Sequence, residues 1–166
     1  KTKREKLSFT FAMIYAVAEC ANQIEEFRYR FLDGQVVLFE KIDTAFTYLD
    51  KQTELFKVVN VPFAGDMTEY CKTARRAAEE QSEYFTGPLG NDVFQFSPMP
   101  WVTYTHISHT NSGKKDNATP LFDWGKFYER DGKLRMPFSV QAHHSFVDGL
   151  HVGRLADMLQ SLLNVE

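Results

Sequence analysis

The change of pattern within residues 136–153, MPFSVQAHHSFVDGLHVG, strongly constrains the fold of this chain. Phe138, Val140 and Ala142 alternate with polar residues, which predicts a half-buried strand. Apolar residues then recur every three or four positions, which predicts an amphipathic helix. They are Val152, Leu155, Met158, Leu159, Leu162 and Leu163. A short turn must therefore join a strand to a helix here, and rigid elements on both sides can position a reactive group.

Two adjacent histidines and an acidic residue occupy that turn, in the pattern His143-His144-x-x-x-Asp148-Gly149. Because histidine titrates near neutral pH, one imidazole can act as a base, with a carboxylate nearby. Two other interpretations stay open. Asp148 stands where the N-cap of the helix is expected, and the histidines could be a partly buried pair without chemistry.

The HHxxxDG pattern resembles the motif of coenzyme-A-dependent acyltransferases, and three further segments are similar to the chloramphenicol acetyltransferase family. Residues 97–102 (SPMPWV) resemble its S-x-x-P-W segment, and residues 125–127 (GKF) resemble its G-K-Y. Residues 46–54 (FTYLDKQTE) resemble its F-T-x-x-x-x-x-T-E run. The order and spacing agree from about Phe9 to the end, so the resemblance covers most of the chain.

The resemblance implies an acetyl-CoA-dependent O-acetyltransferase that acts on chloramphenicol or a related small alcohol. Acetyl-CoA is then a co-substrate, with no permanently bound cofactor. His144 is implied as the general base, and His143 is expected to point the other way because consecutive strand residues face opposite sides. Ser97 is implied as the donor that stabilises the oxyanion, although an ordinary strand serine before a proline fits the sequence too.

Other site residues follow from the same resemblance. Asp148 is expected to be structural, pairing with an arginine that this chain does not identify, and Gly149 to allow close approach. Trp101 and Lys126 are implied on the coenzyme side, with a core tryptophan and an exposed strand lysine as the alternatives.

The acceptor side is implied to include Tyr84, Ile107, Asp123 and His109. The family usually has threonine or serine in place of Asp123. A carboxylate there would repel the developing negative charge unless it is protonated or turned away, so replacement by threonine is expected to raise the rate. This departure keeps a second hypothesis open, a catalytically weak relative that binds acyl-CoA or a drug.

Patterns along the chain predict an α/β two-layer sandwich, with a mixed, mostly antiparallel sheet packed by a few helices, and the resemblance implies the same. Asp-Gly pairs mark two hairpin turns, and Asp66 with Glu69 forms a capping-box pattern. The expected helices are 9–25, about 67–84, and the one after Asp148. The expected strands are 27–31, 36–39, 45–49, 93–97, 101–108, 122–129 and 134–143, with an exposed turn at 111–117.

Composition restricts the partners. A net charge of -3 gives no reason to expect nucleic acid or an anionic membrane surface, and no apolar run is long enough for a membrane span. Cys20 and Cys71 lack metal-ligand spacing and are expected to be free thiols in a reducing cytoplasm. Residues 1–166 are expected to form a single acetyltransferase domain without the N-terminal strand and helix of the family. The resemblance also implies a homotrimer with active sites between subunits.

Overall fold

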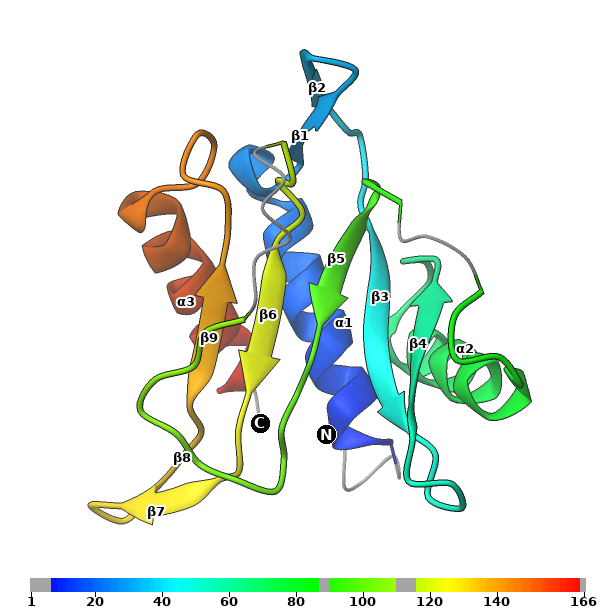
Figure 1. Ribbon diagram of the computed structural model, residues 1–166. Coiled ribbons are helices and arrows are strands. Elements are labelled where there is room, and N and C mark those ends of the chain that lie inside the picture. Colours follow the sequence, from blue (N-terminus) through cyan, green and yellow to red (C-terminus); the bar gives the residue numbers. More distant parts are fainter. Residues whose placement is uncertain (1–6, 87–89, 110–115, 165–166) are drawn as a thin grey trace.

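A computed structural model describes residues 7–86, 90–109 and 116–164 of the chain. Its centre is a five-stranded sheet in the order β4-β3-β5-β6-β9 (Figure 1). The strands are β3 (Asp43–Leu49), β4 (Phe56–Val61), β5 (Val93–Phe96), β6 (Leu121–Trp124) and β9 (Phe138–Gln141). The pairs β3–β4 and β6–β9 are antiparallel, whereas β3–β5 and β5–β6 are parallel. The mixed sheet and its helices confirm the predicted fold class.

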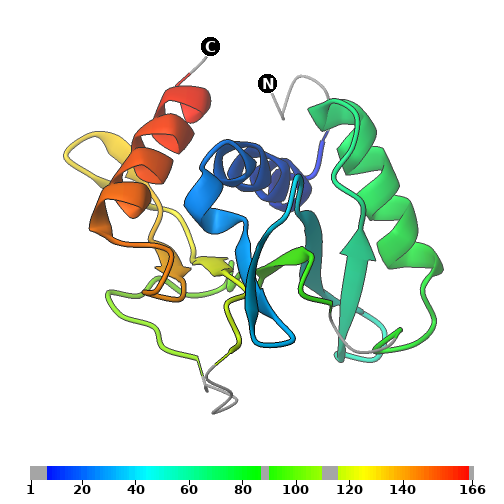
Figure 2. The ribbon, with the colours of Figure 1, turned by 90° about the horizontal axis from the view of Figure 1, so that it is seen from above.

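Three helices cover one face of this sheet, as Figures 1 and 2 show. They are α1 (Phe9–Asn22), α2 (Met67–Glu80) and α3 (Gly149–Leu163). Aromatic side chains at alternate strand positions fill the layer between sheet and helices. The fully buried ones on the central strands are Phe46, Phe94, Phe96, Phe122 and Trp124. The opposite face carries no helix in the described residues, and residues 97–109 cross part of it (Figure 2).

Both predicted Asp-Gly turns form hairpins. β1 (Tyr29–Leu32) pairs with β2 (Gln35–Leu38), and β7 (Tyr128–Arg130) pairs with β8 (Lys133–Arg135). Both turn residues have positive φ in each hairpin, at 50° and 77° in the first and at 56° and 69° in the second. Asp-Gly turns accommodate this conformation readily.

Three predictions about strands were wrong or incomplete. Residues 101–108 form no strand, because this segment follows two prolines and crosses the sheet face without a ladder. The strand β4 was missed, although its valines make a regular antiparallel ladder with β3. The last hairpin is interrupted at Gly125, where an added Cβ would lie 2.7 Å from the carbonyl oxygen of Val102. The chain therefore leaves the main sheet, and β7–β8 forms a separate ribbon.

The helix predictions differ only at the ends. α1 ends at Asn22, and a short 3₁₀ helix, η1 (Glu25–Phe27), follows it. α2 ends at Glu80 and begins with the predicted capping box. Both cysteines are buried and neither is in a disulfide, as predicted, and burial raises the pKa of Cys20 to about 11. Most of the expected turn at 111–117 lies outside the described residues.

Candidate active site

Ser97 directly follows β5 on the face of the sheet away from the helices. Its backbone N–H donates to the carbonyl oxygen of Phe122 at 3.1 Å, which continues the parallel register and places Ser97 beside Asp123. Ser97 lines a hollow of about 260 Å³ together with Gln95, Leu121 and His109. The hollow is thus a place where a small molecule can meet the serine hydroxyl.

Asp123 is fully buried next to this hollow and is paired with a histidine. Its Oδ2 lies 2.8 Å from Nε2 of His109, whereas its Oδ1 has no hydrogen-bond partner. Burial raises the pKa of Asp123, and the opposing effect of His109 is smaller. The carboxylate on the acceptor side is therefore neither free nor exposed, because His109 covers it.

The predicted base lies in the turn at the other end of the sheet. His144 is exposed, whereas His143 and Phe146 are half-buried. His143 packs edge-on against Phe31 at 5.3 Å, and its Nδ1 accepts from the N–H of Ser145 at 3.2 Å. Phe146 also packs on Phe31, at 4.7 Å. Phe31 of the β1–β2 hairpin thus contacts the turn before and after His144, and His144 itself stays accessible.

Asp148 caps α3, as one of the open interpretations proposed. Its Oδ1 accepts from the N–H groups of Leu150 and His151 at 2.8 and 3.4 Å. The Nδ1 of His151 accepts in return from the N–H of Asp148 at 3.1 Å, so the ring proton lies on Nε2, which is 3.3 Å from Oε1 of Glu26. Backbone donation, first of all from Leu150, lowers the pKa of Asp148. Gly149 is the first residue of the helix.

The arginine partner expected for Asp148 is not found among the described residues. Asp148 forms no ion pair with an arginine of the described residues. The contacts that link Asp148 through His151 to Glu26 were not predicted from the sequence, although histidine at the third helical position is a variant of the capping-box pattern.

Ser97 and His144 lie at opposite ends of the sheet. The strands β5 and β6 run in one direction and β9 runs in the other (Figure 1). The register aligns Ser97 with Ser139, so two strand spacings and two residues separate its Cα from that of Gln141 by about 12 Å. The turn with His144 lies beyond Gln141. One chain therefore does not bring the two predicted catalytic groups together.

The two predicted coenzyme residues lie near each other. The backbone N–H of Lys126 donates to the carbonyl oxygen of Val102 at 2.7 Å, next to Trp101. Both side chains are exposed, Trp101 by 56%. The indole packs edge-on against Phe56 at 6.2 Å. Trp101 is thus a surface residue, which excludes the alternative of a core tryptophan.

The remaining acceptor-side residues surround the hollow less closely. The carbonyl oxygen of Tyr84 accepts from the N–H of Val58 at 2.8 Å, and Val58 lines the hollow. Ile107 is half-buried in the segment that crosses the sheet. The pairing of His109 with Asp123 was not predicted. His109 lies in an irregular segment, so no periodic pattern relates it to Asp123, fourteen positions further along the chain.

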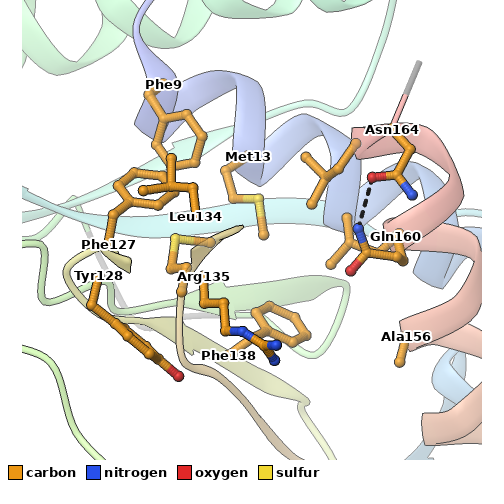
Figure 3. A pocket seen from close by; sticks show the side chains of 13 residues that line it. Phe9, Met13, Phe127, Tyr128, Leu134, Arg135, Phe138, Ala156, Gln160 and Asn164 are labelled. Atoms are coloured by element: carbon orange, nitrogen blue, oxygen red, sulfur yellow. Dashed lines mark hydrogen bonds between the residues drawn. The ribbon is translucent and has the colours of Figure 1, made fainter. Parts of the chain in front are cut away.

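A larger hollow of about 530 Å³ lies elsewhere, between α1, the β7–β8 ribbon and α3 (Figure 3). Phe9, Met13 and Phe138 line it, and a hydrogen bond of 3.0 Å joins Gln160 to Asn164 at its rim. None of the predicted site residues contributes to its lining. Ser97 and His109 line the smaller hollow instead.

Within residues 7–86, 90–109 and 116–164, no group of three metal-ligating side chains comes together. The helices in the same residues are too short or too polar to cross a membrane.

Comparisons with known proteins agree with the sequence motifs. A sequence model of the family described as chloramphenicol acetyltransferase matches residues 1–160. A chloramphenicol acetyltransferase of Vibrio anguillarum is 32% identical over 163 residues, which cover 92% of this chain and 75% of the relative. One of Campylobacter coli is 32% identical over 170 aligned positions, covering 99% and 82%.

Solved structures show the same relationship. A structure named chloramphenicol acetyltransferase has a TM-score of 0.88 at 29% identity, covering 98% of this chain and 81% of the other. A probable dihydrolipoamide acetyltransferase from Listeria monocytogenes has a TM-score of 0.68 at 12% identity, covering 96% and 72%, and shows a shared fold alone.

Proposed function

Since this chain belongs to the chloramphenicol acetyltransferase family, whose members are acyltransferases, we propose that it transfers an acetyl group from acetyl-CoA to a hydroxyl group of chloramphenicol or a related small alcohol. The observation that carries this proposal is the turn between β9 and α3. Its aromatic packing and its helix cap hold the backbone, while His144 stays exposed. A fixed backbone with an accessible imidazole is what a general base requires.

The reaction assigns one role to each group. His144 takes the proton of the acceptor hydroxyl as its oxygen attacks the carbonyl carbon of the thioester. The hydroxyl of Ser97 donates a hydrogen bond to the oxyanion that forms. The C–S bond then breaks, and the leaving thiolate takes the proton from His144. A positioned base contributes about 10²- to 10⁴-fold in rate, and one oxyanion donor about 10²- to 10³-fold.

Because Ser97 and His144 lie at opposite ends of one sheet, the proposed active site combines residues of two copies of the chain. His144 of one copy faces the hollow of its neighbour, which supplies Ser97, and we propose that the assembly is a homotrimer. The wide separation of the two groups within one chain supports this arrangement.

The coenzyme is proposed to lie along the segment that carries Trp101 and Lys126. Both are exposed and adjacent, so a flat ring and a positive charge can meet the coenzyme's adenine and phosphates. The acceptor is proposed to enter the hollow near Tyr84, Ile107 and Asp123. We also propose a cytoplasmic location, which is supported by two buried cysteines that are not joined in a disulfide.

Thiol release from acetyl-CoA, measured with and without chloramphenicol, tests this function. We expect thiol release that depends on the acceptor and that is lost in His144→Ala. Chloramphenicol is the first acceptor to test in a series of small alcohols. It is suggested by the name of the family, whereas the residues of the hollow do not identify an acceptor.

A binding protein without turnover is the second candidate, and the unpartnered Oδ1 of Asp123 favours it, since a buried carboxylate opposes an oxyanion. Calorimetry separates the two. Binding of acetyl-CoA and of an acceptor without any thiol release would support the binder.

A further inference from the structure

His109 and Ser97 line the same hollow, and Asp123 lies behind His109. The side chain of His109 is 27% exposed, whereas that of Asp123 is fully buried. Nε2 of the imidazole is occupied by Oδ2 at 2.8 Å, so Nδ1 is the remaining polar atom of the ring. Among the described residues, none is hydrogen-bonded to Nδ1. The pair therefore offers one ring nitrogen to a molecule in the hollow.

The protonation of Nδ1 depends on the net charge of the pair. With one proton, which lies between Nε2 and Oδ2, the pair carries a charge of about -1 and Nδ1 is a bare acceptor. With a second proton the pair is neutral and Nδ1 is a donor, whether the first proton stays on the ring or moves to the carboxyl. Burial raises the pKa of Asp123, which favours the pair with the second proton. In that neutral pair Nδ1 carries a proton.

The other groups near Asp123 do not compensate for its charge. The hydroxyl of Tyr104 is buried without a partner, and burial together with the Asp123 charge raises the pKa of Tyr104 to about 12. Tyr104 therefore stays neutral over the working range. Ser97, Gln95 and Leu121, which face the hollow, carry no charge. His109 is the group that neutralises the carboxylate.

We propose that His109, held by Asp123, is a second oxyanion donor of this enzyme, and that its Nδ1–H contacts the thioester oxygen together with the hydroxyl of Ser97. The inference rests on the proposed function, since it adds a catalytic group to the same reaction. The proton stays on Nδ1 throughout, so no additional reactant is needed. Asp123 acts through His109 and is a positioning residue. The carboxylate that would repel an oxyanion is thereby converted into part of a donor.

Nitrogen-15 NMR of the imidazole tests the resting state without any turnover. Nδ1 of His109 is expected to carry a proton at pH 7. A bare Nδ1 at pH 7 in the wild type would overturn the inference.

Kinetics test the role in the reaction. The double variant His109→Phe with Asp123→Leu removes both partners, so that no unpaired charge stays buried. We expect its kcat to fall about 10²-fold with little change in KM for acetyl-CoA. The exposed loop residue His106 provides a matched control, and His106→Phe is expected to keep the wild-type rate.

The outcomes separate this inference from the proposed function. An unchanged kcat in a folded double variant, shown by circular dichroism, contradicts the donor role while the transferase stands. If the wild type transfers no acetyl group to any acceptor, the proposed function and the donor role both fail.

Discussion

Two histidines contact carboxylates in different parts of the molecule, and the same residue types do different work in each. On the open face of the sheet, His109 contacts Asp123, which is fully buried, and the pKa of that carboxyl is raised by burial. At the start of α3, His151 accepts a hydrogen bond from the backbone of Asp148, whose side chain is 53% exposed. The pKa of Asp148 is lowered, mainly because the N–H of Leu150 donates to its carboxylate.

The difference shows that the surroundings of a carboxylate decide its role. Asp148 remains charged in contact with water and organises the N-terminus of α3, which fixes the turn with His144. Asp123 has lost contact with water, so it needs a proton donor, and His109 is that donor. The start of α3 thus holds the turn of the proposed base, and the buried pair lies beside the hollow that Ser97 and His109 line.

The largest expected effect concerns the proposed base. His144→Ala should lower kcat by about 10³-fold without changing the melting temperature, because the side chain is exposed and acts only in the reaction. His143→Ala is the matched control. It removes the packing against Phe31 and should lower the melting temperature more than turnover. The assignment of the pair is reversed if His143→Ala alone stops turnover in a folded protein.

In the hollow, Ser97→Ala should lower kcat by about 10²-fold with little change in KM. The reason is that an oxyanion exists only in the transition state, so its donor contributes little to substrate binding. Steady-state kinetics with acetyl-CoA and an acceptor measure this. A loss of equal size in substrate binding would mean that Ser97 lines the hollow without stabilising the oxyanion.

The opposite pKa shifts predict opposite dependences of stability on pH. The raised pKa of Asp123 contributes stability below its unfolded pKa of about 3.9, and that contribution is lost as pH rises through the folded pKa. The lowered pKa of Asp148 contributes stability above about pH 3.9, and that contribution is lost as pH falls through the folded pKa.

Melting temperatures between pH 3 and 8 check these two signs. The melting temperature of Asp123→Asn relative to wild type should rise with pH, whereas that of Asp148→Asn relative to wild type should fall. Slopes of the same sign for both variants would remove the physical basis of the comparison.

The smallest expected effect concerns the helix cap. Asp148→Ala should lower the melting temperature by about 2 to 4 °C, because two N–H groups of the first helical turn lose their acceptor. Asp148→Ser, which keeps a capping oxygen, should recover most of the loss. Equal losses in both variants would indicate that the charge, and not the cap, stabilises α3.

The sequence predicted those parts of the fold that depend on local pattern. The alternation before His143, the apolar spacing after Asp148 and the two Asp-Gly turns each specify an element within a few residues. Residues 101–108 were predicted as a strand because they contain β-branched and aromatic residues. Only the tertiary structure shows that this segment crosses a sheet face with no neighbouring strand to pair with.

The same limit applies to the site. The histidine turn could be found from its motif, but the contact between His109 and Asp123 depends on where an irregular segment crosses the sheet. From the sequence alone, Asp123→Thr was expected to raise acetyl transfer. The contact reverses that expectation, since the substitution would leave His109 without its partner and should lower the rate.

The central claim is that catalysis needs His144 of one copy and Ser97 of another, and mixing two inactive variants tests it most directly. His144→Ala and Ser97→Ala are co-expressed, so that mixed assemblies form. At some interfaces, Ser97 of a His144→Ala chain meets His144 of a Ser97→Ala chain. Such a site contains both unsubstituted residues. Acetyl transfer well above that of either variant alone is predicted, and activity no higher than the better of the two would contradict a site shared between copies.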